Sequence, residues 1–324
     1  MKSEKLFVLF LLLPMVTVET GVFDFFNGFF GNVGPIDSKI DTVRPFDSKE
    51  FMEDLRKSLF GQHIALETIL KAVTWFMKNP DPPKPLALSL HGPTGVGKSY
   101  VMKIIARNIY EMGEKSKHIH TFIASYHFYN NSEVAIYKAQ LKEWIYGNVS
   151  RFSRSMFVFD EMDQMNPHLI DTIKPFLEYI PHLDGVSFNN AIFIFLSQAG
   201  ANVITNVALD FWRKGKEREE LQMNTLGMET QIYQAIFNNK ESGFWHSCLI
   251  DHHLVDHFIP FLPLERKHVK QCVLAEMTNH NITDSDVIDK VFKDIPFFPD
   301  EEKIFSIKGC KTVNNKLGLH VELD

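Results

Sequence analysis

Hydrophobic positions along the chain fall into two alternating kinds of segment. Short continuous apolar runs, bounded by glycine, proline or acidic residues, predict buried strands; they cover residues 86–92, 118–125, 155–161 and 190–200. Longer segments with apolar residues at helical spacing predict helices; they cover residues 47–79 with a break at Gly61, 99–113, 132–147 and 166–181. Strands that alternate with helices in this way predict an α/β fold, with a parallel sheet covered on both faces.

The pattern changes near Phe244. Beyond this residue the strand-like runs fade, and the segments 263–281 and 283–294 have helical spacing. We therefore expect a large α/β domain at residues 46–243, followed by a small helical domain at residues 244–324.

The N-terminus has the pattern of a secretory signal peptide at residues 1–20. Lys2 and Lys5 precede an apolar run that is too short to cross a bilayer but suits the core of a signal peptide. A short membrane anchor is the alternative, and either would direct the rest of the chain into the secretory lumen. Residues 21–45 form an apolar, aromatic stretch and a linker, which either lies in a membrane interface or packs on the folded domain.

Composition and charge narrow the classes of function. The 324 residues are 45% hydrophobic and 23% charged, and the formal net charge is −6. Because the charges are interspersed and form no basic stripe, a nucleic-acid-binding surface is excluded. Three sequons, at Asn130, Asn148 and Asn281, are candidate glycosylation sites in a luminal protein. Three cysteines do not make a disulfide scaffold, and either one pair with a spare thiol or buried thiols alone fit this number.

The segment LHGPTGVGKSY, between the first predicted strand and the helix that follows it, carries the strongest chemical signal. It matches the pattern G-x-x-x-x-G-K-[ST] in full, at Gly92, Pro93, Thr94, Gly95, Val96, Gly97, Lys98 and Ser99. Glycines let main-chain N–H groups turn inward around phosphate oxygens, and the start of the next helix attracts the same anion. We expect Lys98 to reach the β- and γ-phosphates of ATP and Ser99 to bind Mg²⁺.

Two further predicted strands end in polar residues that would complete such a site. Asp160 and Glu161 end the apolar run at 155–161. We expect Asp160 to hold Mg²⁺ and Glu161 to be the general base for the attacking water. Gln198 ends the next strand, where it would contact the γ-phosphate or its water; an ordinary strand-end amide is the alternative.

These segments closely resemble the torsin family of AAA+ ATPases. The resemblance rests on HGPTGVGKSYV, MFVFDEMD, AIFIFLSQAGA, VALDFW, FIPFLPLERKHVKQCV and FFPDEEKIFSIKGCKTV, and it extends from about Phe46 to the end of the chain. It implies a P-loop AAA+ domain whose parallel sheet is flanked by helices, plus a small C-terminal helical domain. It also implies residence in the endoplasmic reticulum lumen and nuclear envelope, homo- or hetero-oligomers, and chaperone-like remodelling of protein or membrane-associated complexes. Activation would come from the lumenal domains of type II transmembrane partners.

The resemblance also assigns roles to residues. The polar residues described above become the Walker A, Walker B and sensor-1 positions of the family. Gly309, Cys310 and Lys311 match its sensor-2 motif, which places Lys311 at the γ-phosphate. The family further implies a disulfide between Cys272 and Cys310 that couples lumenal redox state to the nucleotide site, and it leaves Cys248 as the spare thiol.

The sequence departs from the family pattern at three positions. The family usually has Trp where Pro93 stands, often Asn where Ser99 stands, and Asn at the position of Gln198. Ser99 favours ATP binding, whereas Pro93 and Gln198 favour an alternative function, a nucleotide-gated binding module with negligible hydrolysis. A small-molecule kinase is a weaker third interpretation. The family lacks its own arginine finger, and we interpret Arg213 and Arg218 as solvated helix charges, since charges of both signs alternate around them.

Overall fold

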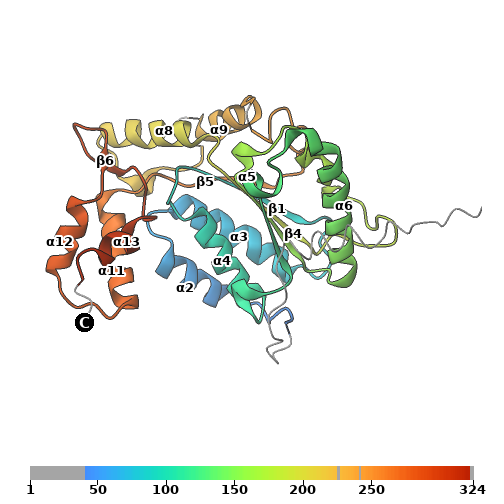
Figure 1. Ribbon diagram of the computed structural model, residues 1–324, viewed down its shortest axis with the longest axis horizontal. Helices are drawn as coiled ribbons and strands as arrows, with labels where there is room; N and C mark the ends of the chain where they lie inside the picture. The colour runs from blue at the N-terminus through green and yellow to red at the C-terminus, as the bar shows by residue number, and fades with distance from the viewer. Residues whose placement is uncertain (1–40, 225–226, 241, 322–324) are drawn as a thin grey trace, which may run out of the picture. The chain divides into compact units, whose positions relative to one another are not determined.

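The computed structural model describes residues 41–224, 227–240 and 242–321 (Figure 1). These described residues all belong to one compact unit. The predicted signal peptide, and all of the apolar stretch before residue 41, lie outside the described residues. Within the part that is described, no helix has the length and hydropathy that crossing a bilayer requires.

A five-stranded sheet lies at the centre, with the strand order β2-β3-β4-β1-β5 and every pair parallel. The strands are β1 (Leu86–His91), β2 (Ile119–Ile123), β3 (Met156–Asp160), β4 (Ile192–Ser197) and β5 (His257–Pro260). The order is not sequential, so helices must cross over the sheet between strands. The predicted α/β fold with a parallel sheet is confirmed.

Helices cover the sheet and connect its strands (Figure 1). The α-helices of this part are α2 (Ser48–Ser58), α3 (His63–Lys78), α4 (Lys98–Ile109), α5 (Ala124–His127), α6 (Val134–Arg151), α7 (Lys174–Leu177), α8 (Ala201–Arg213), α9 (Met228–Phe237) and α10 (Cys248–Asp251). The 3₁₀ turns are η1 (Gly113–Lys115), η2 (Asn131–Glu133), η3 (Met162–Gln164), η4 (Ile170–Ile173) and η5 (Arg218–Glu220).

Both faces of the sheet are buried, which explains the continuous apolar runs in its strands. One face, with Leu88, Val158 and Ile194, packs in a hydrophobic core with residues of α2, α3 and α4. On the other face the rings of Phe159, Phe195 and their neighbours stack on one another, 5.5 Å apart between these two centroids. Packing on both faces therefore fixes the positions of the strands, and with them the positions of the polar residues at their carboxyl ends.

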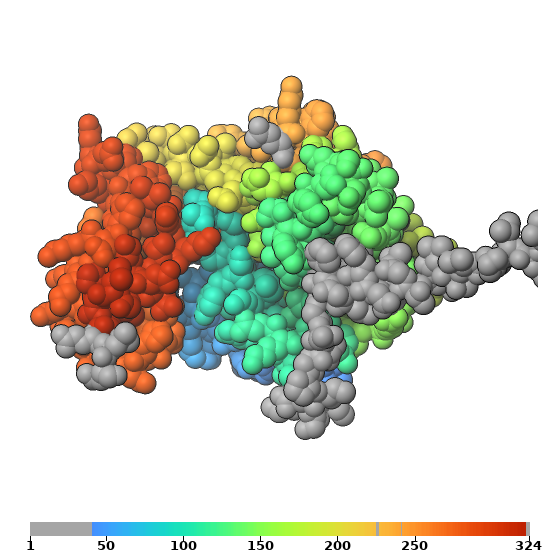
Figure 2. Space-filling model, viewed as in Figure 1, coloured from blue at the N-terminus to red at the C-terminus, as the bar shows by residue number. Residues whose placement is uncertain are grey.

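The C-terminal part is mainly helical, as predicted. It consists of α11 (Arg266–Asn279), α12 (Asp286–Lys293), α13 (Val313–Gly318) and the short antiparallel pair β6 (Phe297–Phe298) and β7 (Phe305–Ser306). In Figure 2 these orange-red residues lie beside the blue-to-cyan residues of α2 to α4. Val269 and Val313 belong to the same hydrophobic core as those helices, so the C-terminal helices pack on the face of the sheet that α2 to α4 cover.

Two segments differ from the sequence expectation. The strand β5 was not predicted, and it lies within the residues assigned to the helical domain, so the sheet extends further along the chain than expected. The helix expected at 166–181 is instead the 3₁₀ turn η4 followed by one turn of α-helix in α7. Pro175 stands in the first turn of α7, and a proline beyond that position would remove an i→i−4 hydrogen bond, which fits a helix that restarts there.

Candidate functional site

The glycine-rich loop connects the end of β1 to the start of α4, as the sequence predicts. Gly92, Gly95 and Gly97 all have positive φ, at 152°, 72° and 109°. A Cβ on Gly92 would meet the main chain of Phe261, and one on Gly95 would meet the main chain of Lys308. Glycine is therefore required here both by backbone conformation and by the close approach of two other segments.

The ammonium group of Lys98 lies against this loop. Its Nζ donates to the carbonyl oxygens of Gly92 (2.6 Å) and Pro93 (2.7 Å). Burial lowers the pKa of Lys98 to about 8, while the nearby carboxylates of Asp163 and Asp160 act to raise it and Lys311 acts to lower it. The lysine is thus a partly desolvated cation at the start of α4, under the influence of two carboxylates and a second lysine.

Asp160 and Glu161 come from the end of β3. Asp160 is in register with Ile123 of β2, and its carboxylate accepts a hydrogen bond from the N–H of Glu161 (2.8 Å). Burial raises the pKa of Asp160, an effect opposed by that hydrogen bond and by Lys98. An ionised carboxylate is an oxygen ligand of the kind that Mg²⁺ prefers, and the charge of Lys98 favours the ionised form of Asp160.

Glu161 has a left-handed backbone, with φ 58° and ψ 42°. Its carboxylate accepts hydrogen bonds from the main-chain N–H (3.3 Å) and from the hydroxyl of Ser125, which follows β2. Sequence reasoning missed Ser125. The signal was available, because parallel strands end at the same sheet edge and Ser125 follows the strand beside β3.

Gln198 follows β4, and its main-chain N–H donates to Oδ1 of Asp163 (2.8 Å). The hydroxyl of Ser197 donates to the same oxygen (3.4 Å). Asp163 therefore ties the end of β4 to the turn after β3, and its charge acts on Lys98. Asp163 was also missed, since no local pattern distinguishes it from other acids after a strand. The side chain of Gln198 is exposed.

The predicted sensor-2 segment packs on the glycine-rich loop. The N–H of Cys310 donates to the carbonyl of Gly95 (2.9 Å). A Cβ on Gly309 would meet the main chain of Gly95, and the side chain of Lys311 begins within 3.1 Å of a Cβ placed on Gly95. The structure therefore brings Lys311 to the loop that the sequence assigned to phosphate, with its side chain exposed.

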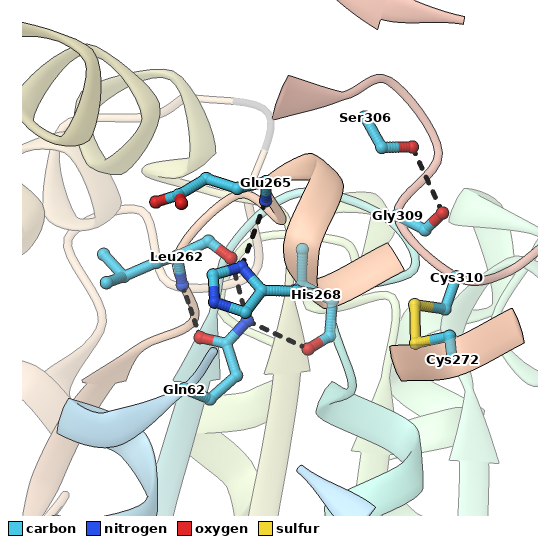
Figure 3. The surroundings of a disulfide bond; sticks show 9 residues. Gln62, Leu262, Glu265, His268, Cys272, Ser306, Gly309 and Cys310 are labelled. Atoms are coloured by element: carbon cyan, nitrogen blue, oxygen red, sulfur yellow. Dashed lines mark hydrogen bonds between the residues drawn. A yellow bond between two sulfur atoms is a disulfide. The ribbon is translucent and has the colours of Figure 1, made fainter. Parts of the chain in front are cut away.

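Cys272 and Cys310 form a disulfide in the structure, with Cα atoms 6.1 Å apart. Cys272 is on α11, so the disulfide joins that helix to the sensor-2 segment (Figure 3). Cys248 is a free thiol, half-buried, and burial raises its pKa to about 11, an effect that the neighbouring Asp171 reinforces. A thiol with a raised pKa is a poor nucleophile, so Cys248 is not a candidate catalytic residue.

The interpretation of Arg218 as a solvated charge is wrong. Its side chain is buried (8% exposed for the residue), forms an ion pair with Glu265 (3.2 Å), and donates twice to the carbonyl of Gly61 (2.8 and 3.0 Å). Burial is the main cause that lowers its pKa, and Glu265 opposes that effect. Arg213 is exposed, and it pairs with Glu302 (2.7 Å) rather than standing free in solvent.

The three sequons lie in different settings. Asn148 is inside α6, and its Nδ2 donates to the carbonyl of Trp144 (2.7 Å), while Nδ2 of Asn130 donates to Glu133 (2.8 Å). Asn281 is exposed in the turn after α11. Of these three asparagines, Asn281 is the exposed one, whereas Asn130 and Asn148 are half-buried.

The donors of the site fit a magnesium–nucleotide complex. Gly92, Gly95 and Gly97 have positive φ, the backbone conformation with which main-chain N–H groups can turn toward an anion. Lys98 supplies a positive charge for phosphate, and Ser99 and Asp160 supply the oxygen ligands that Mg²⁺ prefers.

Comparison with known proteins agrees with this geometry. The chain matches the family model described as "Torsin" over residues 38–159 and the one described as "Torsin-1A, C-terminal domain" over residues 264–320, together more than half of its 324 residues.

Among solved structures, it is similar to the S. cerevisiae Hsp104–ADP complex (TM-score 0.58, 16% identity, 84% of this chain and 48% of that chain). It is also similar to Hsp104 in a closed-state cryo-EM reconstruction with ATPγS and FITC-casein (TM-score 0.56, 15% identity, 85% of this chain and 46% of that chain). The chain thus spans about half the length of these Hsp104 chains, and it shares their AAA+ fold. From the two family matches and this fold, we conclude that the chain belongs to the torsin family of AAA+ proteins.

Proposed function

We propose that this chain binds ATP with Mg²⁺ and hydrolyses it to ADP and phosphate. One observation carries the proposal: Lys98 lies against the glycine-rich loop that joins β1 to α4, and the segment that carries Lys311 is bonded to the same loop through the N–H of Cys310 and the carbonyl of Gly95. A glycine-rich loop before a helix, with one lysine folded onto it and a second lysine from a distant segment, suits a bound triphosphate better than it suits a structural ion pair.

The residues have distinct tasks in the proposed reaction. The loop N–H groups and Lys98 hold the β- and γ-phosphates, and Ser99 and Asp160 hold Mg²⁺, which neutralises phosphate charge. The carboxylate of Glu161 takes a proton from water as the water oxygen forms a bond to the γ-phosphorus. The bond from that phosphorus to the β-γ bridging oxygen breaks, and its electron pair leaves with ADP. Gln198 and Lys311 contact the γ-phosphate, where negative charge shifts during transfer.

We further propose that hydrolysis moves the C-terminal helical domain relative to the α/β domain and so remodels a protein or a membrane-associated complex. The direct contact of Gly309 and Cys310 with Gly95 supports this, since a change at the loop reaches the C-terminal part through those bonds. The proposed location is the endoplasmic reticulum lumen and nuclear envelope, in a homo- or hetero-oligomer. The Cys272–Cys310 disulfide suits an oxidising compartment, and Asn281 is the favoured glycan acceptor.

The proposed activators are lumenal domains of type II transmembrane proteins, which would supply an arginine. Arg218 is buried and paired with Glu265, so it is not available for that role, whereas the exposed Arg213 forms a surface ion pair with Glu302.

A nucleotide-gated binding module with negligible turnover is the second candidate. Its supporting observation is the double hydrogen bond from Ser125 to Glu161, which holds the general base toward β2.

The deciding experiment measures phosphate release by the purified protein, titrated with lumenal domains of candidate partners, beside calorimetry of Mg·ATP binding. For an ATPase, Glu161→Gln binds ATP as the wild type does and its turnover falls by roughly 100-fold or more. Binding without release under every condition would identify the module. A wild type that shows no heat with Mg·ATP would refute both candidates.

A further inference from the structure

The side chain of Gln62 connects the glycine-rich loop to the rest of the fold. It lies between α2 and α3, is 1% exposed, and uses both amide hydrogens and its oxygen. Its Nε2 donates to the carbonyls of Val96 (3.2 Å) and Leu262 (2.8 Å), and its Oε1 accepts from the N–H of Leu262 (2.8 Å). One buried amide thus holds a residue of the phosphate loop and a residue just beyond β5.

The backbone next to Gln62 is itself fixed onto the start of α11. Gly61 has φ 67°, and a Cβ there would lie 2.7 Å from the ring of His268. Arg218 donates twice to the Gly61 carbonyl and pairs with Glu265, the residue before α11. The Nδ1 of His268 accepts from the N–H of Glu265 (3.2 Å), as Figure 3 shows. Together with the contacts of Gly61 and Arg218, this bond forms one connected group.

The disulfide reaches the neighbouring residue of the loop from the same helix. Cys310 donates its N–H to Gly95 and is covalently joined to Cys272 of α11. His268 and Cys272 are four residues apart in α11, so they lie on the same face, one turn from each other. Two consecutive loop carbonyls are therefore connected to one face of α11 by two routes. The carbonyl of Gly95 is reached through the N–H of Cys310 and the disulfide to Cys272. The carbonyl of Val96 is reached through the hydrogen bond from Gln62 and the packing of Gly61 on His268.

We propose that Gln62 is a positioning residue for the nucleotide loop, and that Gln62 and the Cys272–Cys310 disulfide support the same loop turn in parallel. Because either support alone keeps that turn in place, the loss of one support weakens nucleotide binding more when the other is also missing. This inference rests on the proposed binding of ATP at the loop. Gln62 touches neither phosphate nor Mg²⁺ in this scheme; it acts through Val96.

A double-mutant cycle in the full chain tests the proposal. Gln62→Met keeps the length of the side chain and removes its hydrogen bonds, and Cys272→Ser removes the disulfide without altering Cys310. The affinity for Mg·ATP is measured by calorimetry for wild type, both single variants and the double variant. We expect Gln62→Met to weaken binding about threefold or less with the disulfide present, and roughly tenfold or more in the Cys272→Ser background. The same factor in both backgrounds, or no effect in either, overturns the proposal.

A matched control separates loop positioning from general loss of stability. Asn108 is another buried amide (2% exposed), in α4, and it bonds to Asp54 and Ile104 instead of the loop. Asn108→Leu should lower the unfolding midpoint as Gln62→Met does, yet leave ATP affinity unchanged in both backgrounds. If it weakens binding equally, the effect of Gln62 is merely structural. Should Gln62→Met not fold, Gln62→Leu removes the same hydrogen bonds with another apolar side chain and introduces no buried charge.

Hydrogen–deuterium exchange provides a readout that needs no nucleotide. The peptide spanning residues 92–99 should exchange faster in the double variant than the two single variants together predict. Unchanged exchange there refutes the positioning role. If instead exchange changes as expected while the wild type ignores Mg·ATP, the positioning role stands and the proposed ATP site fails.

Discussion

Ser125 holds the carboxylate of Glu161 through both its main-chain N–H (3.3 Å) and its hydroxyl. Ser125 follows β2 and Glu161 follows β3, and these strands are adjacent and parallel. Glu161 has a left-handed backbone, a conformation that costs a non-glycine residue on the order of 1 kcal/mol or more, and its carboxylate is bonded to Ser125 beyond the end of β2. The carboxylate of the proposed general base is thus restrained by a residue that follows the adjacent strand β2.

The first prediction concerns this contact. Ser125→Ala removes the hydroxyl donor and keeps the N–H donor, so the Glu161 carboxylate is restrained less. A hydrogen bond to a charged group is worth about 1.5–3 kcal/mol, so we expect phosphate release to rise by up to roughly tenfold, with ATP affinity unchanged within about twofold. Steady-state phosphate release at saturating Mg·ATP measures it. Ser125→Thr, which keeps the hydroxyl, is the control and should match wild type. Slower release in Ser125→Ala would mean that Ser125 orients the base productively.

The second prediction concerns Asp163, which accepts the N–H of Gln198 and thereby fixes where that residue leaves β4. Asp163→Ala removes the acceptor and frees the Gln198 backbone, so turnover should fall about tenfold. Asp163→Asn keeps an oxygen that can accept the same N–H, and it should retain turnover within about threefold of wild type. Turnover numbers from full saturation curves give the comparison. Equal losses in both variants would place the role of Asp163 in its charge on Lys98 and remove it from Gln198.

The sequence predicted the parts of the site that depend on local pattern. The loop from Gly92 to Ser99, the strand before it and the acids of β3 were all found, because breakers and apolar runs mark them without reference to other segments. The contacts between these parts were not predicted. Arg218 was misinterpreted because its partner Glu265 is 47 positions away, and the alternating charges around it resemble a solvated surface.

The strand β5 was missed for a related physical reason. It has only four residues, begins with the exposed His257 and ends at Pro260. Its place in the sheet is set by pairing with β1, where Ser89 is in register with Phe258. Period and composition do not carry such information, because a four-residue strand is at the lower limit of the length at which a strand pattern can be recognised. Gln62 was hidden likewise, since its partners Val96 and Leu262 come from other segments.

The third prediction tests the contact between the sensor-2 segment and the loop. Gly309 has φ 52°, and a Cβ there would collide with the main chain of Gly95. Gly309→Ala must therefore push the two segments apart and adopt an unfavourable backbone. We expect a loss of about 1–3 kcal/mol in the free energy of unfolding and weaker Mg·ATP binding. Gly318, at the end of α13, has nothing near its Cβ position, so Gly318→Ala is the matched control and should be neutral or slightly stabilising. Urea unfolding and calorimetry measure both variants; unchanged ATP binding in Gly309→Ala would separate the two segments functionally.

The last prediction is that the free energy of unfolding depends on pH because of the titration of His91. This residue ends β1, directly before the phosphate loop, and is fully buried beside the rings of Phe244 and Phe258. Its Nδ1 lies 3.1 Å from the carbonyl of Ala199, and its Nε2 lies 2.6 Å from the hydroxyl of Ser89. A neutral ring protonated on Nδ1 satisfies both contacts, since Nδ1–H donates to the carbonyl and Nε2 accepts from the hydroxyl.

Burial lowers the pKa of His91 from 6.5 to about 3. Between these values the unfolded chain binds a proton that the folded chain does not, so stability is fully present above pH 6.5 and is lost as pH falls. At pH 5, which is 1.5 units below 6.5, the loss from this group alone is about 2 kcal/mol relative to pH 7. His91→Gln should be less stable than wild type at pH 7, yet lose about 2 kcal/mol less on acidification. His120 and His268, whose pKa values burial also lowers, keep part of the acid sensitivity in the variant. Urea unfolding at pH 7 and pH 5 measures the difference, and the exposed His182→Gln is the control. If both variants lose as much free energy of unfolding between these pH values as wild type does, the His91 ring is protonated in the folded protein. Its pairing with Ala199 and Ser89 is then not as described.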